Sequence, residues 1–468
     1  MARIGYMILS NLLGDTIRKC VPMANITSED IEVDGEVRCL RLRQANRRGI
    51  VPVPARLDGL IPPHHLARLI WQAVESLDLS AFYAHLKVCD GQPGAPAIDP
   101  KILITLWLYA ISQGVTSARE IDELRVSHIA YMWICGGVSL NYHTISDFRT
   151  DYEAELDELM TQVVKQLDTA GLVDLSTQGQ DGMRVRASAG AASFRREPTL
   201  EKALEQAQAR AAEVEKVGQA EDDQRTAKQQ AAQERAVRER VARLEAALDE
   251  MPAAQAAKKP EEQDKARVSS TDAEARVMKM GDGGYRPAYN WQFSVELSNL
   301  VITGVDVINI GSDKAQMEPM VSQVVQRTGQ LPENWLVDGG FIKFTAIEAL
   351  AAQGIVVFGP VPEPKGENRD RYAPAATDSA VIAEWRQRMG TAEGKAMYKQ
   401  RSLVELPNAQ ARSRYGIQQV RVRGRRKVRC VALWVAIVHD LLIWIRHLGQ
   451  AALSSIGQLH ACRSGVGA

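Results

Sequence analysis

The chain has 468 residues, an apolar fraction of 45%, and equal totals, 57 each, of Lys plus Arg and of Asp plus Glu. This length allows two or three domains with their own cores. Because the charges balance, whole-chain charge does not indicate a polyanionic partner, and any basic surface must be local. The six cysteines are scattered and form no Cys-x-x-Cys pair, which is typical of reduced thiols in the cytoplasm and argues against a disulfide framework or a zinc site.

The N-terminal segment alternates short apolar runs with Arg and Pro clusters and predicts no particular fold. Between residues 62 and 170 the pattern becomes helical, with amphipathic stretches at His65–Ile70 and Ile102–Ile111. Ser117 and Thr144 stand where helix N-caps are expected. We therefore expect an all-helical domain of the kind that can present one helix to a DNA groove, although a plain helical bundle has the same pattern.

The helical period stops at residue 171, where two β-compatible pieces, Leu172–Leu175 and Met183–Arg186, flank Asp181-Gly182. From residue 199 to 266 the chain is rich in Ala, Glu, Gln, Arg and Lys, a composition typical of a long solvated helix or coiled coil. Its apolar residues recur at alternating spacings of four and three, as in Val237, Val241, Leu244, Leu248 and Met251. An antiparallel helical hairpin or a dimerising coil would both fit this seam.

The chain becomes globular again after the helical insertion. Tyr289–Val295 and Val301–Val307 predict adjacent strands, Lys314–Thr328 predicts a helix, and Trp335–Val337 predicts a strand that ends at Asp338. This alternation is typical of a mixed α/β sheet, and it makes the coiled-coil segment an insertion within one sheet domain.

The most apolar run, Val431–Ile445, is shorter than a bilayer span and contains His439 and Asp440. It therefore predicts a buried helix and no membrane role.

Four residues near the C-terminus share one face of a predicted helix. Tyr398, Arg401, Glu405 and Arg412 fall within roughly 60° of one another at 3.6 residues per turn. A carboxylate can bind a divalent metal while guanidiniums grip phosphate oxygens, so this face suits phosphodiester chemistry. An exposed helix with ordinary ion pairs is the alternative, and Pro407 disfavours helix at Leu406.

Two aspartates precede glycines at the expected strand ends, where Asp-Gly is also common for backbone reasons alone. With the C-terminal residues, their order, Asp181, Asp338 and Tyr398-x-x-Arg401-x-x-x-Glu405 followed by a basic residue, resembles the DDE transposases of insertion sequences that carry a Tyr-Arg-Glu-Lys signature. Similar flanking segments are Asp181–Ala187, Ser270–Arg276, Tyr289-Asn290-x-Gln292 and Arg423-Gly424-x-x-Lys427-Val428. Upstream, Asp99-Pro100, Leu108-Tyr109, Gly114, Ser117-x-Arg119 and Thr144-Ile145-x-x-Phe148-Arg149 are similar to the amino-terminal helical domain of the family.

The chain departs from the family pattern at three places. Arg412 stands in place of the signature lysine, Gln178–Gln180 is less apolar than a buried strand, and Asp440 stands where Asn is frequent. Arg and Lys differ in the geometry of their contacts, and a polar first strand suggests a catalytically decayed copy.

The resemblance implies an α/β ribonuclease-H-like catalytic domain with an inserted helical coiled-coil segment, preceded by an all-α domain. It implies the following organisation: residues 1–61 unassigned; 62–170, helical DNA-binding domain; 171–198, first part of the catalytic domain with Asp181; 199–266, helical insertion; 267–450, remainder of the catalytic domain; and 451–468, tail.

The implied active site is a triad of Asp181, Asp338 and Glu405 that holds two Mg²⁺ ions, with Mn²⁺ as a substitute. Such ions lie about 3.5–4 Å apart in two-metal phosphoryl transfer. They would support nicking at transposon ends and strand transfer into target DNA. Tyr398, Arg401 and Arg412 would contact DNA or its phosphates.

The resemblance also implies DNA partners, namely terminal inverted repeats and a target, a homodimer or larger multimer, no membrane, and a cytoplasmic, nucleoid-associated location. A basic run after the catalytic helix, Arg412, Arg414, Arg421, Arg423, Arg425, Arg426, Lys427 and Arg429, suits a phosphate footprint or is a solvated loop. A nuclease that does not join strands and a decayed DNA-binding protein remain alternatives. A coiled-coil structural protein would explain only residues 199–266.

Overall fold

The computed structural model describes residues 25–33, 36–44, 56–86, 97–218, 226–364 and 370–464. The chain divides into two compact units, residues 1–69 with 123–139 and residues 70–122 with 140–468.

The smaller unit contains an antiparallel β-hairpin, β1 (Asn25–Val33) and β2 (Glu36–Gln44), in the segment for which the sequence predicts no fold. Its helical elements include η1 (Leu57–Leu60) and α7 (Ile129–Cys135). Asp58 joins these two elements, because it accepts a hydrogen bond from the Trp133 indole of α7 at 3.2 Å. It also pairs with Arg68 at 2.6 Å.

Helices make up most of the chain before the sheet: α3 (Leu66–Glu75), α4 (Ser80–Tyr83), α5 (Pro100–Ser112), α6 (Ala118–Ser127), α8 (Tyr142–Asp151) and α9 (Glu153–Thr169). The helices predicted at 65–70 and 102–111 are confirmed as α3 and α5. Asp99 caps α5 by accepting a hydrogen bond from Lys101 N, and Pro100 occupies the first turn, where its missing N–H has no intrahelical partner.

The predicted cap at Thr144 is wrong. Asn141 caps α8 instead, because its side-chain oxygen accepts a hydrogen bond from Thr144 N at 3.0 Å. α8 and the next helix, α9, separate at Tyr152.

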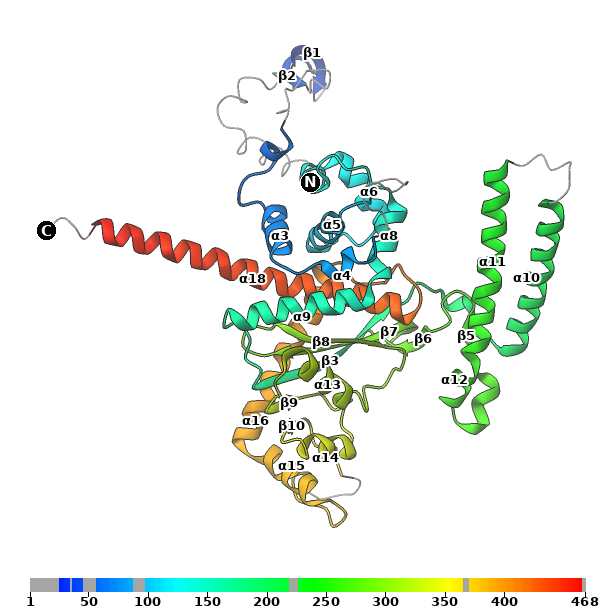
Figure 1. The fold of residues 1–468 in the computed structure, drawn as a ribbon, viewed down its shortest axis with the longest axis vertical. Helices are drawn as coiled ribbons and strands as arrows, with labels where there is room; N and C mark the ends of the chain where they lie inside the picture. Colours follow the sequence, from blue (N-terminus) through cyan, green and yellow to red (C-terminus); the bar gives the residue numbers. More distant parts are fainter. Residues whose placement is uncertain are drawn as a thin grey trace. The chain divides into compact units, whose positions relative to one another are not determined.

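The larger unit is built around a six-stranded mixed sheet of order β10–β9–β3–β7–β6, in which β8 also pairs with β7 (Figure 1). Its strands are β3 (Thr177–Arg186), β6 (Arg276–Lys279), β7 (Tyr285–Glu296), β8 (Ile302–Ile308), β9 (Asn334–Leu336) and β10 (Val356–Phe358). β3 is antiparallel to β7 and parallel to β9, and β9 is parallel to β10. This mixed arrangement after a helical region is consistent with a ribonuclease-H-like domain, with β3 at its centre.

The strands and helix predicted at 289–295, 301–307, 314–328 and 335–337 are confirmed as β7, β8, α13 (Met317–Thr328) and β9. The strand piece predicted at 172–175 is wrong. Asp174 there accepts a hydrogen bond from Ser176 N and forms a local turn.

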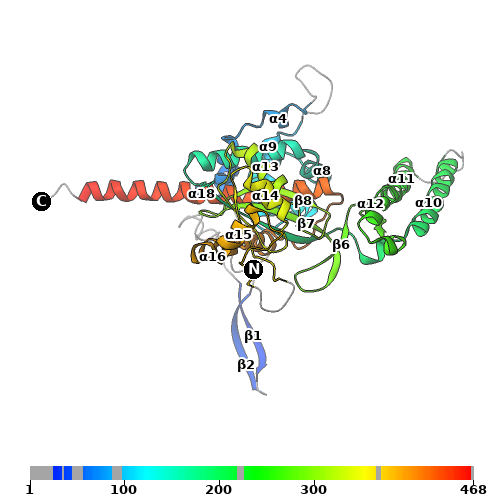
Figure 2. The same ribbon diagram turned by 90° about the horizontal axis from the view of Figure 1, so that it is seen from below.

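The segment between β3 and β7 folds mainly as helices: η2 (Ala191–Ser193), β4 (Phe194–Arg195), α10 (Glu197–Gly218), α11 (Ala227–Asp249), α12 (Met251–Ala256), η3 (Pro260–Lys265) and β5 (Val268–Ser269). α10 and α11 lie side by side in both views (Figures 1 and 2). Leu200, near the start of α10, shares a buried cluster with Leu244 and Met251, near the end of α11 and just beyond it. The insertion is therefore a helical hairpin within one chain, and supercoiled packing stays a prediction.

The remaining helices follow β9: α14 (Phe344–Ala351), α15 (Ala380–Gly390), α16 (Ala392–Lys399), η4 (Gln400–Val404), α17 (Glu405–Ser413) and α18 (Arg425–Ser464). α18 contains a stretch, Arg425–Leu448, that by length and composition could cross a membrane, but 83% of its most apolar window is buried. The apolar stretch is therefore longer than the predicted run at 431–445, and its burial confirms the predicted core helix. Asp440 on α18 accepts a hydrogen bond from Ile302 N, and complete burial raises its pKa well above the ordinary value.

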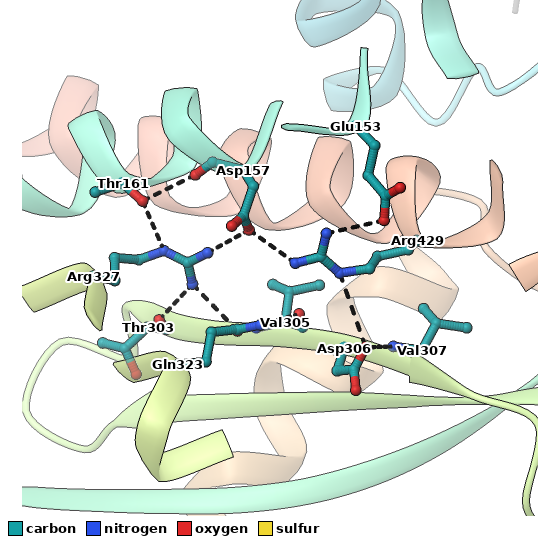
Figure 3. A network of polar contacts seen from close by, with 10 residues as sticks. All are labelled: Glu153, Asp157, Thr161, Thr303, Val305, Asp306, Val307, Gln323, Arg327 and Arg429. Carbon is teal, nitrogen blue, oxygen red and sulfur yellow. Dashed lines mark hydrogen bonds and ion pairs between the residues drawn. The ribbon is translucent and has the colours of Figure 1, made fainter. Parts of the chain in front are cut away.

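A charged network joins α9 to the sheet and to α18 (Figure 3). Asp157 pairs with Arg327 at 2.5 Å and with Arg429 at 3.0 Å. Arg327 also donates to Thr303 O at 2.7 Å, and Arg429 pairs with Glu153 at 3.0 Å. Burial lowers the pKa of Arg327, and Asp157 opposes this effect. One carboxylate therefore links three elements of the larger unit.

We expect Asp157→Asn to reduce the free energy of unfolding by about 2 kcal/mol, measured by urea denaturation. It would leave the buried Arg327 without its nearest counter-charge; the effect is smaller than for a fully buried pair because the Asp157 side chain is 35% exposed. The control is Asp282→Asn, which breaks an exposed pair with Arg286 and should cost much less, because exposed ion pairs contribute little to stability. Equal losses in the two variants would contradict the assigned role of Asp157.

Candidate active site

Asp181 lies within the central strand β3. The sequence predicted that it lies at a strand end. β3 continues through Asp181 and Gly182, which pair with Phe293 and Gln292 of β7. The Asp-Gly pair is therefore part of a regular ladder and forms no turn. The Asp181 side chain is only 13% exposed.

Asp338 follows the neighbouring parallel strand. It lies two residues beyond the end of β9, and its Oδ1 accepts a hydrogen bond from Gly340 N at 2.7 Å. This contact fixes the carboxylate at the start of a local turn. Because β3 and β9 are parallel neighbours, the two aspartates arise from adjacent strands.

Tyr398, Arg401 and Glu405 lie on consecutive helical segments: the end of α16, the 3₁₀ segment η4 and the first residue of α17. The expected break at Leu406 does not occur, because Pro407 falls in the first turn of α17, where a missing N–H is tolerated. η4 packs directly on β3, since a Cβ atom at Gly179 would lie 2.2 Å from Val404 Cγ2. Glycine at this position thus allows the helical segment to approach the strand that bears Asp181.

The guanidinium of Arg401 contacts all three predicted acids. Its Nη2 lies 2.7 Å from Asp181 Oδ1 and 3.7 Å from Asp338 Oδ2, and its Nη1 lies 2.8 Å from Glu405 Oε1. Nearby carboxylates repel one another unless a cation lies between them. Arg401 supplies that positive charge here, a role that the sequence analysis did not predict.

The three carboxylates suit a hard divalent cation by their chemistry, and their convergence on one guanidinium supports this fit. Across the described ranges, no group of three His, Cys, Asp or Glu residues is placed to hold a metal ion directly. Binding of a metal by all three acids would therefore require Arg401 to move.

Asn408 is a site residue that the sequence analysis missed. Its Nδ2 donates a hydrogen bond to Asp181 Oδ2 at 2.9 Å, and the residue is only 8% exposed. Burial raises the pKa of Asp181, whereas Arg401 and the Asn408 hydrogen bond oppose the rise. The position of Asn408, three residues after Glu405 on the helix, was the one available signal, because residues three apart share a face.

The two other predicted DNA-contact residues lie in different surroundings. Burial raises the pKa of Tyr398, which is half-buried beside Arg401. Arg412 Nη2 lies 3.4 Å from the backbone oxygen of Arg184, so it reaches the end of β3 rather than the three acids.

The polar segment Gln178–Gln180 is part of a regular buried strand. Gln180 accepts a hydrogen bond from the Trp335 indole and donates one to Gln292 Oε1, and Gln178 accepts from Thr303 Oγ1. The polarity of this segment therefore does not disrupt the strand, because buried amides are tolerated where they are hydrogen-bonded, and catalytic decay stays an untested alternative.

The fold and the placement of the acids are consistent with a ribonuclease-H-like DDE domain, a class of nucleic-acid-processing enzyme. Residues 55–151 match the family model of a transposase domain (DUF772), and residues 254–441 match the model of a transposase DDE domain. The chain is therefore a transposase with a DDE catalytic domain, and it is an enzyme. No curated protein and no solved structure matches it. The matched DDE residues contain Asp338 and Glu405 but begin after Asp181 and the helical hairpin.

We expect Asn408→Ala to lower the free energy of unfolding at neutral pH by about 1–3 kcal/mol, because it removes a hydrogen bond to a buried carboxylate. The folded-state pKa of Asp181 lies above its ordinary value, so its ionised form reduces stability above that pKa. This cost disappears as the pH falls below the unfolded-state pKa. The loss in Asn408→Ala should therefore shrink at acidic pH, measured by urea denaturation across the pH range.

Asn334→Ala is the matched control, since its amide donates to the neutral hydroxyl of Thr177. Its effect should not change with pH. A loss in Asn408→Ala that is equally independent of pH would contradict the contact with ionised Asp181.

Proposed function

We propose that this transposase cleaves DNA at the ends of an insertion sequence and transfers the released strand into target DNA, with Asp181, Asp338 and Glu405 as its metal-binding acids. The observation that carries the proposal is the contact of one guanidinium with all three carboxylates. Three acids from separate elements that share one cation form a set suited to divalent metals.

The chain's own residues would bind and orient the reacting groups. Asp181 and Asp338 project from adjacent parallel strands, and Asn408 fixes the orientation of Asp181 through its hydrogen bond. When bound, two Mg²⁺ or Mn²⁺ ions supply activation of the attacking oxygen and stabilisation of the leaving oxygen. Arg401, released from the carboxylates, would then donate two parallel hydrogen bonds to two oxygens of one phosphate.

The reaction sequence needs no outside energy source. Water attacks the phosphorus at the transposon end, and the P–O bond to the leaving 3′ oxygen breaks. The freed 3′-hydroxyl then attacks a target phosphodiester, forming one P–O bond as another breaks. No covalent bond between protein and DNA is required.

A basic loop beside β3 supplies the proposed DNA contacts. Its charged residues are exposed, whereas Tyr415, Ile417, Val420 and Val422 between them are buried. Val420 N donates to Arg186 O at 2.9 Å, so the loop follows the end of the strand that carries Asp181. The exposed cations are Arg412, Arg414, Arg421, Arg423, Arg425, Arg426 and Lys427. They would bind phosphates on both sides of the cut.

Strand transfer of both transposon ends into a target implies DNA partners, a DNA-binding domain and more than one copy of the chain. Terminal inverted repeats and a target would be the DNA partners, residues 62–170 would form the DNA-binding domain, and pairing of two ends would require a homodimer or larger multimer. The enzyme would act in the cytoplasm, at the nucleoid.

We expect Asp181→Ala, Asp338→Ala and Glu405→Ala each to reduce metal-dependent cleavage of a supercoiled plasmid carrying the inverted repeats by more than about 100-fold. Even outer-shell partners of metal ligands typically contribute 10–100-fold. The control is Asp282→Ala in the exposed β6–β7 turn. Strand transfer is measured with pre-cleaved ends and a target plasmid.

Unchanged cleavage in the three variants would place the active site elsewhere. Cleavage without strand transfer would favour a nuclease, and DNA binding without either activity would favour a decayed DNA-binding protein.

We expect the double variant Arg421→Ala, Arg423→Ala to weaken DNA binding and to reduce the magnitude of the slope of log K against log salt by nearly two. Each lost phosphate contact changes that slope by about 0.9. Binding is measured by fluorescence anisotropy at several salt concentrations. The matched control, Arg235→Ala with Arg240→Ala, removes two exposed arginines from α11. Equal slopes in the native chain and the loop variant would contradict the assigned role of the loop.

A further inference from the structure

A fourth acidic residue, Asp313, lies close to Gly182 and Gly340, which follow Asp181 and Asp338 along the chain, and the three proposed metal ligands do not explain it. It belongs to the segment between β8 and α13 and is 6% exposed. Its Oδ1 accepts hydrogen bonds from Asn290 Nδ2 at 2.6 Å and from Gln292 Nε2 at 2.7 Å, and its Oδ2 pairs with Arg184 Nη2 at 2.8 Å. Both oxygens of this carboxylate are therefore occupied by side chains of β7 and β3.

Two glycines allow Asp313 to lie this close to the site. A Cβ atom on Gly182, the residue after Asp181, would lie 2.5 Å from Asp313 Oδ1. A Cβ atom on Gly340 would lie 2.9 Å from Asp338 Oδ1 and 3.3 Å from Asp313 Oδ2. Asp313 thus contacts the strand that bears Asp181 and the turn that bears Asp338.

The contacts of Asp313 also explain residues that the triad leaves without a role. Asn290 and Gln292 alternate on β7, and Gly182 and Arg184 are paired with them on β3. All four therefore lie on one face of the sheet, the face opposite Asp181. Arg184 is held further by its hydrogen bond to Gly311 O at 2.8 Å.

We infer that Asp313 is a positioning residue that sets the separation of Asp181 and Asp338. The inference rests on the proposed function, because it assumes that these two acids bind metal. Asp313 acts from behind the sheet, where Arg184, Asn290 and Gln292 fix its carboxylate. Through the close contact at Gly182 it limits the position of β3, and through Gly340 it limits the position of the Asp338 turn.

By positioning Asp181 and Asp338, Asp313 would control the affinity of the site for its metal ions. Two carboxylates bind a shared cation well only when their spacing matches its coordination sphere, and residues that orient metal ligands typically contribute 10–100-fold to affinity. Asp313 is poorly placed to be a ligand itself, since its two oxygens already accept three hydrogen bonds.

The test measures the Mn²⁺ affinity of the full chain by electron paramagnetic resonance. It compares the native chain with Asp313→Asn and Arg184→Gln. Both variants should bind Mn²⁺ about 10–100-fold more weakly, and the Mg²⁺ concentration for half-maximal cleavage should rise in parallel, with circular dichroism unchanged. The control Asp282→Asn makes the same chemical change in an exposed turn. If Asp313 only stabilised the fold, a variant that still folds would keep the native Mn²⁺ affinity and the native Mg²⁺ concentration for half-maximal cleavage.

A folded Asp313→Asn variant with native Mn²⁺ affinity would overturn the inference. Tighter binding in Arg184→Gln would also overturn it, because a freed Asp313 would then be acting as a ligand. If Asp313→Asn does not fold, Arg184→Gln decides the question, because it removes the partner of Asp313 Oδ2 without changing a residue next to a proposed ligand. Weaker binding in Arg184→Gln supports the inference, and native binding overturns it.

Asp338→Ala separates this inference from the proposed function. Loss of Mn²⁺ binding in Asp338→Ala together with native binding in Asp313→Asn would defeat only the role of Asp313. A native chain that binds no Mn²⁺ would defeat both.

Discussion

Repulsion among carboxylates is the constraint on which the rest of the site depends. Two unit charges 4 Å apart interact by about 4 kcal/mol at an effective dielectric constant of 20, so three converging acids need a cation between them. Arg401 provides it, with its guanidinium within 4.0 Å of Asp181, Asp338 and Glu405. The order of elements follows from this requirement: two adjacent parallel strands bring the aspartates together, and η4 lies on β3 so that the arginine reaches them. The same arrangement prepares the acids for a divalent ion of higher charge.

The sheet that carries these acids is polar on one face, and that polarity is functional support rather than a defect. Gln178, Gln180, Asn290, Gln292 and Ser294 are all fully buried. Such residues destabilise a core unless they are paired, and here the glutamines and Asn290 hydrogen-bond to one another, to Thr303 or to Asp313. A hydrogen-bonded face holds its strands in one register more strictly than an apolar face would, because slippage would leave amides unpaired. Precise spacing of Asp181 and Asp338 benefits from that rigidity.

Local patterns in the sequence predicted most elements but not the contacts between distant ones. Alternating apolar residues identified β7 and β8, and helical spacing identified α5 and α13. The Asp-Gly pair at Asp181 misled, because glycine favours turns and also allows close packing inside a strand. Asn408 escaped notice because its partner, Asp181, is 227 residues away. Its spacing from Glu405 places Asn408 on the same helical face, but a single sequence does not show which distant residue that face meets. The spacing of Arg401 and Glu405 on one helical turn, in contrast, was visible from the start.

The hairpin insertion can interrupt the catalytic domain because its own core stabilises it. Leu200, Leu244 and Met251 bury one another without help from the sheet. Where the chain returns from the insertion, Asp272 accepts hydrogen bonds from the Tyr289 hydroxyl and from Gly424 N, and Glu274 accepts one from Arg425 N. These acids lie at the N-terminus of α18, where negative charge is favoured by the helix dipole and by unpaired N–H groups. These hydrogen bonds fasten the exit of the insertion to the end of the basic loop, so the insertion leaves the catalytic domain beside the residues proposed to bind DNA.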